Sequence, residues 1–211
     1  MKRVYFIRHG QSFYNAAALK GYDPMIPDAE LTDLGKRQAT ELSQQVESLP
    51  DIDLIVCSPL SRAIQTTFIA FDKRIAFTPL IILPDIRERV TGCDDLGSTP
   101  SELTNKFPSV SFDHLQNIWW YTNGPPEETD PNASKERFIA KPFQEPHDMF
   151  LSRVEDFRLW MAKRKERCVV VVGHCDFICQ VVGFDLKNCQ LVCTLFDPET
   201  KQFTVQNKSS L

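Results

Sequence analysis

Four short apolar runs constrain the fold of this chain more than any other feature of its sequence. They occupy residues 4–7, 54–56, 80–83 and 169–172. Polar or turn-forming residues flank each run, and continuous apolar runs of this length are typical of buried parallel strands. Because helical patterns separate the runs, the sequence predicts an α/β protein. We expect a three-layer α/β/α sandwich with a mostly parallel central sheet.

Helices are predicted after the first two runs. Apolar residues at near-helical spacing over 34–49 indicate one helix, with Thr32 as its N-cap. We expect Ser58 to cap a second helix, which has Pro59 at its first position and ends near Phe71.

The C-terminal half has its own periodic patterns. Apolar residues recur at positions i, i+4, i+7 and i+11, and this spacing predicts a long amphipathic helix over about 147–165. A shorter helix is indicated over 177–182, and Gly183 is expected to stop it. Two apolar segments, 191–196 and 203–205, bracket a turn sequence and predict an antiparallel hairpin.

The segment from about 91 to 145 differs from the rest of the chain. It contains six of the fourteen prolines and the pair Trp119-Trp120, and residues 99–102 have the form of a capping box. We interpret it as an insertion over the sheet and the site, partly helical and partly loop. We therefore expect a single domain over 1–211 that includes this insertion.

Composition and charge narrow the function classes. The net charge is −4, from 24 basic and 28 acidic residues, which gives no reason to expect nucleic acid as a partner. No apolar run approaches the ~20 residues that cross a bilayer, and the first apolar stretch is shorter than that of a signal peptide. Seven scattered cysteines favour reduced thiols in a cytoplasmic protein without a structural metal. The sequence leaves a homodimer open.

Two of the four histidines directly follow two of the apolar runs. His9 comes after 4–7 and is preceded by Arg8, and His174 comes after 169–172. Ligands of open α/β sheets bind where the strands end. If the two strands are neighbours, both imidazoles meet at one point. One such histidine alone is more often structural, whereas two histidines with an adjacent arginine indicate a site.

The other two runs lead to further polar candidates. Arg62 falls in the first turn of the helix expected after 54–56, where helix amides favour an anion, and Glu88 follows 80–83. Arg8 and Arg62 can clamp a phosphoryl group, and a neutral imidazole can accept it covalently. A carboxylic acid with a raised pKa can protonate the departing oxygen. This chemistry requires no metal or cofactor, because the cationic side chains balance the charge.

Four ordered motifs carry these residues and resemble the histidine phosphatase superfamily, also called the phosphoglycerate mutase-like family. The motifs occupy 8–10, 31–39, 58–66 and 170–174, and the resemblance covers about 1–97 and 145–185. The Arg-Glu-Arg-x-x-Gly-Cys-Asp form of 87–94 resembles a phosphatase-like branch with plant and fungal members. The resemblance implies the phosphoglycerate mutase-like fold and hydrolysis of phosphomonoesters of small metabolites through a phosphohistidine.

The resemblance also assigns roles to residues. It makes His9 the phosphorylated nucleophile and Glu88 the proton donor. The catalytic set that it implies is His9, Glu88, His174, Arg8 and Arg62. Asn15 matches a phosphate-contacting asparagine. Where the family often has Ser-His-Gly-Gly, this chain has Gly-His-Cys-Asp, so Cys175 stands at a position of backbone contact with the substrate.

Two alternatives stay open beside the phosphatase: a cofactor-dependent phosphoglycerate mutase and a non-catalytic module that binds phosphorylated ligands. A mutase must hold a second anionic group. The cations in or beside the insertion are Arg87, Arg89, Lys106, Lys135, Arg137 and Lys141. A surface role explains each equally well, and Arg87 and Arg89 fit a solvated charge cluster. The aromatic residues 119–121 either line a substrate pocket or hold the insertion on the core.

Overall fold

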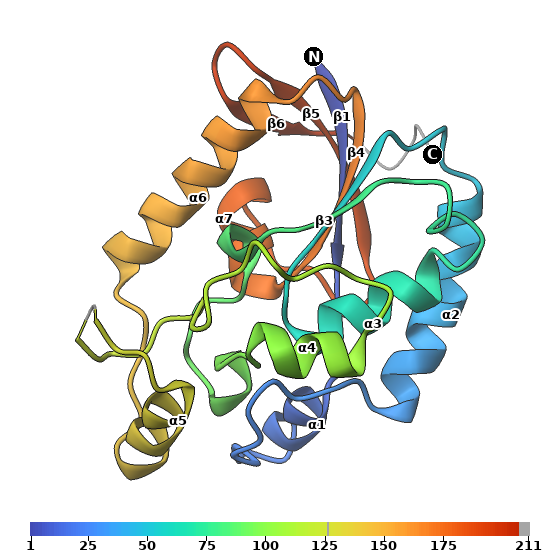
Figure 1. Cartoon of the computed structure of the whole chain (residues 1–211). Coiled ribbons are helices and arrows are strands. Elements are labelled where there is room, and N and C mark those ends of the chain that lie inside the picture. The colour runs from blue at the N-terminus through green and yellow to red at the C-terminus, as the bar shows by residue number, and fades with distance from the viewer. Residues whose placement is uncertain (126, 207–211) are drawn as a thin grey trace.

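The four apolar runs form the four parallel strands of a six-stranded central sheet (Figure 1). The structure is a computed structural model that describes residues 1–125 and 127–206. The sheet has the order β3-β2-β4-β1-β5-β6, in which β5 is antiparallel to β1 and β6 is antiparallel to β5. The strands are β1 (Lys2–Arg8), β2 (Leu54–Cys57), β3 (Leu80–Ile82), β4 (Cys168–Gly173), β5 (Leu191–Asp197) and β6 (Gln202–Val205).

Helices cover both faces of this sheet. The helices are α1 (Phe13–Ala18), α2 (Asp33–Glu47), α3 (Ser61–Ala70), α4 (Pro100–Lys106), α5 (Pro131–Ala140), α6 (His147–Lys163) and α7 (Cys175–Val182), with short 3₁₀ helices at Pro84–Ile86 and Cys93–Asp95. Tyr5 and Ile7 of β1 point into a core with α2 and α3, whereas Val4 and Phe6 point into a core with α6 and α7. Figure 1 shows these two helix layers on either side of the sheet. The predicted three-layer α/β sandwich is confirmed.

The pairing of β1 with β4 determines where the site lies. Every residue of β4 is buried, which agrees with its run of four valines. Ile7 pairs with Val172 and Arg8 pairs with Gly173, so the two strands end at the same level. The backbone N–H of His9 donates to the carbonyl of Gly173 at 3.0 Å. The residues after both strands therefore emerge side by side.

Several predicted helix ends are confirmed. The Thr32 hydroxyl accepts a hydrogen bond from the Gly35 N–H at 3.1 Å and caps α2. α6 spans His147–Lys163, and α7 ends at Gly183, whose φ of +89° is a left-handed conformation that suits glycine. The hairpin of β5 and β6 is also confirmed.

The predicted start of the helix after β2 is wrong. α3 begins at Ser61 rather than Pro59, and its N-cap is Leu60. The buried carboxylate of Asp28 accepts a hydrogen bond from the Ser61 N–H at 2.7 Å. A residue far away in sequence thus satisfies the helix terminus, and Ser58 is left free for another contact.

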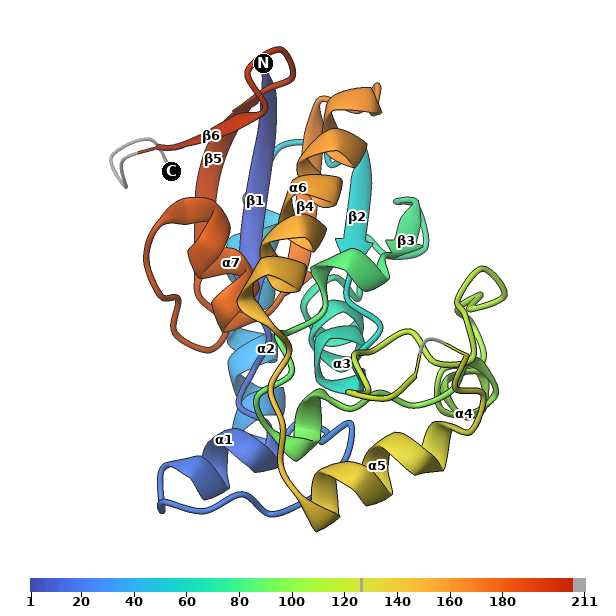
Figure 2. The ribbon, with the colours of Figure 1, turned by 90° about the vertical axis from the view of Figure 1, so that its left-hand side faces the viewer.

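The segment 91–145 contains α4, α5 and the 3₁₀ helix at Cys93–Asp95, and Figure 2 shows α4 and α5 beyond the end of β2. Trp119 and Trp120 attach it to the protein. Their indole N–H groups donate to the Ser98 carbonyl and the Ser134 hydroxyl, each at 2.9 Å. A Cβ at Gly97 would lie 2.3 Å from the Trp119 ring, so only glycine fits there. These contacts lie within the segment itself, whereas both rings are also buried in the core on the side of α2 and α3, and this burial joins the segment to that core.

The helices in the described ranges are too short or too polar to span a membrane.

Candidate active site

His9 and His174 lie next to each other at the ends of β1 and β4. Their ring centroids are 5.0 Å apart, and both side chains are buried. The Nδ1 atom of His9 is 2.7 Å from the carbonyl oxygen of Gly10. Because a carbonyl only accepts, this contact assigns the proton to Nδ1 and leaves a lone pair on Nε2. Burial, together with the charges of Arg62 and Arg8, holds the pKa of His9 well below its usual value. The imidazole is therefore neutral, as a nucleophile must be.

His174 is held by the serine that the sequence assigned to a helix cap. The Nε2 atom of His174 is 2.7 Å from the Ser58 Oγ, which also accepts the Leu60 N–H at 3.3 Å. In the described part of the chain the buried Ser58 hydroxyl has no other acceptor, so its proton points to Nε2. The proton of the neutral His174 ring then resides on Nδ1. Burial and the charge of Arg62 keep the pKa of His174 well below its usual value.

Arg62 lies in the first turn of α3, as predicted, but it is fully buried and bound to two carboxylates. Its Nη1 is 2.6 Å from the Asp94 carbonyl oxygen and 3.2 Å from Asp94 Oδ2, and its Nη2 is 2.8 Å from Asp95 Oδ1. Burial alone would lower the pKa of Arg62, but Asp94 and Asp95 outweigh it and keep the guanidinium charged. Sequence reasoning did not identify these two aspartates as site residues, because acidic neighbours in a loop look the same whether solvated or buried.

Three buried N–H groups near the two histidines lack partners. Arg8 donates from Nη1 to the Leu186 carbonyl at 2.7 Å, which orients its guanidinium. Its Nε, the Nε of Arg62 and the Nδ1 of His174 have no hydrogen-bond acceptor among residues 1–125 and 127–206. Burying an unsatisfied donor costs free energy. Three such donors on three neighbouring cationic or polar side chains suit an anion with several oxygens.

The Glu88 side chain lies at the N-terminus of α7, the helix whose N-cap is His174. Its carboxylate accepts hydrogen bonds from the backbone N–H groups of Arg89 (3.0 Å), Asp176 (3.2 Å) and Phe177 (3.3 Å). Burial, with repulsion from Asp176 and Asp95, raises the pKa of Glu88 to about 7. A carboxyl group with this pKa can give up or take a proton near neutral pH.

Asn15 reaches the site indirectly. Its side-chain oxygen accepts from the Ser12 N–H at 3.2 Å and from the side-chain amide of Asn188 at 3.1 Å. That amide also donates to the His9 carbonyl at 2.9 Å. Sequence reasoning missed Asn188, which comes from the loop before β5 and had no motif to mark it. Cys175 is half-buried at the start of α7, and burial raises the pKa of its thiol.

The expectation of a solvated cluster at Arg87 and Arg89 is wrong. Arg87 Nη2 lies 3.0 Å from Glu145 Oε1, and Arg89 Nε donates to the Glu145 carbonyl at 3.0 Å. Glu145 is buried and also pairs with Arg153 of α6 at 2.8 Å. The segment after β3 packs against the start of α6, and this long-range packing buries the charges.

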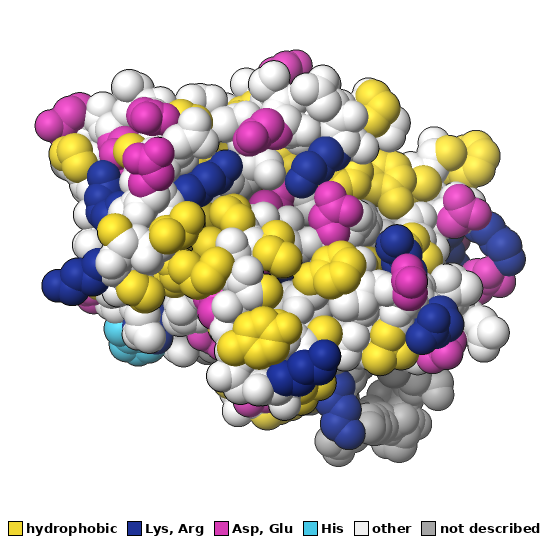
Figure 3. All heavy atoms as spheres, turned by 90° about the horizontal axis from the view of Figure 1, so that it is seen from below, with side chains coloured by type: hydrophobic (Ala, Val, Ile, Leu, Met, Phe, Trp, Pro, Cys, Tyr) yellow, Lys and Arg dark blue, Asp and Glu magenta, His cyan; other side chains and the backbone are white. Residues whose placement is uncertain are grey.

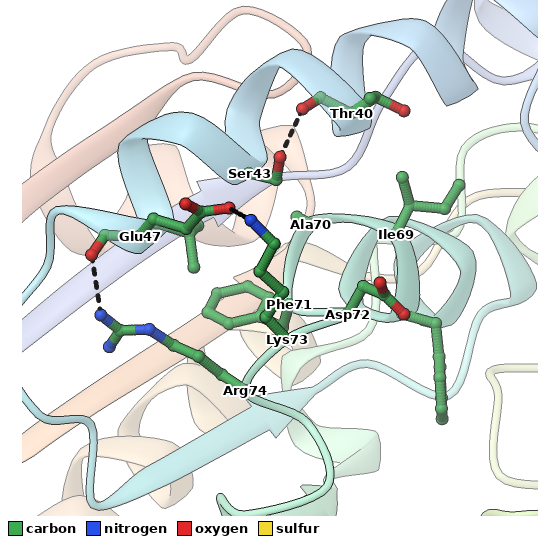
Figure 4. A pocket seen from close by; sticks show the side chains of 11 residues that line it. Thr40, Ser43, Glu47, Ile69, Ala70, Phe71, Asp72, Lys73 and Arg74 are labelled. Carbon is green, nitrogen blue, oxygen red and sulfur yellow. Dashed lines mark hydrogen bonds and ion pairs between the residues drawn. The ribbon is translucent and has the colours of Figure 1, made fainter.

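Two large hollows lie outside this histidine cluster. One of about 520 Å³ lies between α2 and the end of α3, where Lys73 pairs with Glu47 at 2.6 Å (Figure 4). The other, of about 480 Å³, is bordered by Arg87, Trp120 and Met149. None of the predicted catalytic residues lines either hollow.

Two further observations concern a cysteine near the histidines and the arrangement of possible metal ligands. Burial raises the pKa of the Cys57 thiol to about 12, so this cysteine next to the site is not a thiolate. No group of three or more His, Cys, Asp or Glu side chains in the described residues is arranged to hold a metal ion.

Comparisons with known proteins agree with this fold. Residues 4–189 match the profile of the histidine phosphatase superfamily (branch 1). The chain is 25% identical to phosphoglycerate mutase-like protein 1 of Arabidopsis thaliana, over 84% of this chain and 69% of that protein. It is 31% identical to a probable phosphatase of Schizosaccharomyces pombe, over 53% of this chain and 52% of that protein. The crystal structure of the alpha-ribazole phosphatase from Shigella flexneri superposes with a TM-score of 0.59 at 19% identity, covering 97% of this chain and 94% of that one.

The fold and the family profile define an α/β protein of the phosphoglycerate mutase-like type. The chain belongs to the histidine phosphatase superfamily, as its motifs predicted.

Proposed function

We propose that this protein is a phosphatase that hydrolyses phosphomonoesters of small metabolites through a phosphohistidine at His9. The observation that carries the proposal is the state of His9: neutral, with its proton bonded to Gly10 and its Nε2 lone pair free, 5.0 Å from the ring of His174. Relatives named as phosphatases support the same class of reaction.

The reaction has two steps. In the first, the Nε2 of His9 attacks phosphorus, the bond to the substrate oxygen breaks, and the protonated Glu88 gives its proton to that oxygen. In the second, Glu88 takes a proton from a water molecule as the water attacks phosphorus, the N–P bond breaks, and inorganic phosphate leaves. Glu88 regains its proton and His9 its lone pair, so the cycle balances.

The neighbouring donors stabilise the charge that develops. Arg8, Arg62 and the Nδ1–H of His174 offer N–H groups to the phosphoryl oxygens, and their positions are set before substrate binds. The arginines thereby take the part that a metal ion plays in other phosphatases. Seven free thiols fit a reducing compartment, and we place the reaction in the cytoplasm.

The test is hydrolysis of an aryl phosphate by EDTA-treated protein. We expect release of inorganic phosphate without added metal and inhibition by vanadate, which mimics five-coordinate phosphorus. Complete loss of activity with EDTA that added metal restores would contradict the proposal. Binding of phosphorylated ligands without turnover would favour the non-catalytic module.

A second assay separates phosphatase from mutase. The protein is mixed with a phosphorylated donor and 3-phosphoglycerate, and the phosphoryl group is followed to water or to the sugar acid. We expect release to water to dominate. Predominant transfer to the acid would identify a mutase.

A further inference from the structure

We propose that the site is specific for phosphomonoesters whose alcohol part carries no second anionic group and is either uncharged or cationic. The proposal rests on the phosphatase function above and adds the class of substrate. It follows from where the carboxylates and the ion-paired cations lie around the two histidines.

The charge of Arg62 is already largely balanced within the protein. Its guanidinium binds Asp94 and Asp95, and all three side chains are at most 4% exposed. Arg8 is the site arginine that has no carboxylate within ion-pair distance in the described ranges. The pocket thus has enough positive charge for one phosphoryl group but little for a second anion.

Three of the cations in or beside the insertion are already ion-paired within the protein. Arg87 pairs with Glu145 at 3.0 Å, and Arg137 pairs with Glu128 at 2.8 Å. Lys106 lies 3.6 Å from the buried Asp28. A carboxylate or second phosphate on the substrate would have to compete with a protein carboxylate for each of them. The substrate then gains no net attraction from these three, and the Nε of Arg89 already donates to the Glu145 carbonyl.

The side chain of Asp176 adds negative charge beside the proton donor. It occupies the second position of α7, two residues after His174, and its backbone N–H donates to Glu88 at 3.2 Å. The residue is exposed, and partial desolvation and repulsion from Asp95 raise the pKa of its carboxyl group. An anionic group leaving with the alcohol would face this carboxylate, whereas an ammonium group would be attracted to it.

We take the aromatic side chains on and just after α1, which lies beyond the carboxyl end of β1 (Figure 1), as the rim of the site. Tyr14 of this helix lies against Gly92, whose added Cβ would be 2.9 Å from the Tyr14 ring. Phe13 beside it is 51% exposed, and Tyr22 in the following loop is 55% exposed. Figure 3, which views the molecule from below, shows many hydrophobic side chains on this face. Such a rim suits an uncharged organic group.

A matched series of aryl phosphates tests the proposal. The probes are 4-carboxyphenyl phosphate, its uncharged isostere 4-carbamoylphenyl phosphate, and the cationic 4-(aminomethyl)phenyl phosphate. We expect the wild-type kcat/KM for the carboxylate to be about tenfold below that for the carboxamide. In Asp176→Asn we expect this ratio to narrow several-fold. Comparing ratios between enzymes cancels the intrinsic difference between the leaving groups.

The control is Asp51→Asn, which removes an exposed carboxylate from the loop before β2, at the opposite end of the sheet. It should leave the ratio unchanged. Equal kcat/KM for the carboxylate and carboxamide in the wild type, or an unaltered ratio in Asp176→Asn, would overturn the proposal. Absence of turnover with all three esters would instead contradict the phosphatase function itself, and this inference with it.

Discussion

The hydroxyl of Ser58 lies 2.7 Å from the Nε2 of His174 and fixes the ring of the second histidine. Ser58 follows β2 and His174 follows β4, and these strands are neighbours in the sheet. The residue after one strand thus orients the side chain that follows the neighbouring strand. Because Ser58 donates to Nε2, the Nδ1–H of His174 is the donor available to a phosphoryl oxygen.

We predict that Ser58→Ala lowers kcat by roughly tenfold with a smaller change in KM, because His174 loses its orientation and tautomer. Steady-state kinetics with an aryl phosphate measure this split. The control is Ser101→Ala, on the exposed surface of α4, which should leave kcat unchanged. An unaltered kcat in Ser58→Ala would show that the contact does not position His174.

Asp95 ties the segment after β3 to Arg62, and we predict that Asp95→Asn destabilises the fold. Its Oδ1 pairs with Arg62 at 2.8 Å, and its Oδ2 accepts the N–H groups of Thr91 and Gly92, each at 3.0 Å. A neutral amide in this place no longer balances the charge of Arg62. Its NH2 group would also face the two backbone N–H donors. We expect the free energy of unfolding to fall by about 3 kcal/mol in urea titrations. A change no larger than that of the exposed Asp51→Asn would contradict this account.

The pKa of Glu88, raised to about 7, predicts a pH dependence. The acid form donates the proton, so kcat/KM for alkyl phosphates is retained below pH 7 and lost as the pH rises through it. In Glu88→Gln we expect this basic limb to disappear and alkyl phosphate hydrolysis to fall about 100-fold. Aryl phosphates, which leave without a proton, should be much less affected. Equal losses for both classes would make Glu88 a structural residue.

We predict that His9→Ala lowers aryl phosphate hydrolysis by at least about 10³-fold, because the nucleophile is lost. The same substitution at His147, an exposed histidine at the start of α6, should leave the rate near that of the wild type. Circular dichroism verifies that both variants fold. Near-wild-type hydrolysis by His9→Ala would remove His9 from the mechanism.

The strands and the positions of the histidines after them were predictable because both depend on local patterns, whereas the pairing of β1 with β4, on which the meeting of the histidines depends, was only a condition of the prediction. Four apolar runs mark the strands, and the carboxyl ends of neighbouring parallel strands share one edge. His9, Arg62, Glu88 and His174 each follow such a run within a few residues. Assigning the strands therefore also predicted the edge of the sheet at which these four residues lie.

What the sequence did not reveal depends on contacts between distant segments. Asp28 caps α3 from 33 residues away and frees Ser58. Asp94 and Asp95 bind Arg62 across a similar separation. Glu145 buries Arg87 from 58 residues away. Charged residues carry no periodic pattern that separates a buried partner from a solvated side chain, so these pairs appear only in three dimensions.

The central claim is that His9 carries the phosphoryl group during turnover. Rapid quenching of the reaction with a ³²P-labelled ester, followed by peptide mapping, tests it most directly. We predict an acid-labile, alkali-stable label on the peptide that contains His9 and no label in His9→Ala. An acid-stable label on another residue, or steady turnover of the wild-type protein with no labelled His9 at any quench time, would contradict the account.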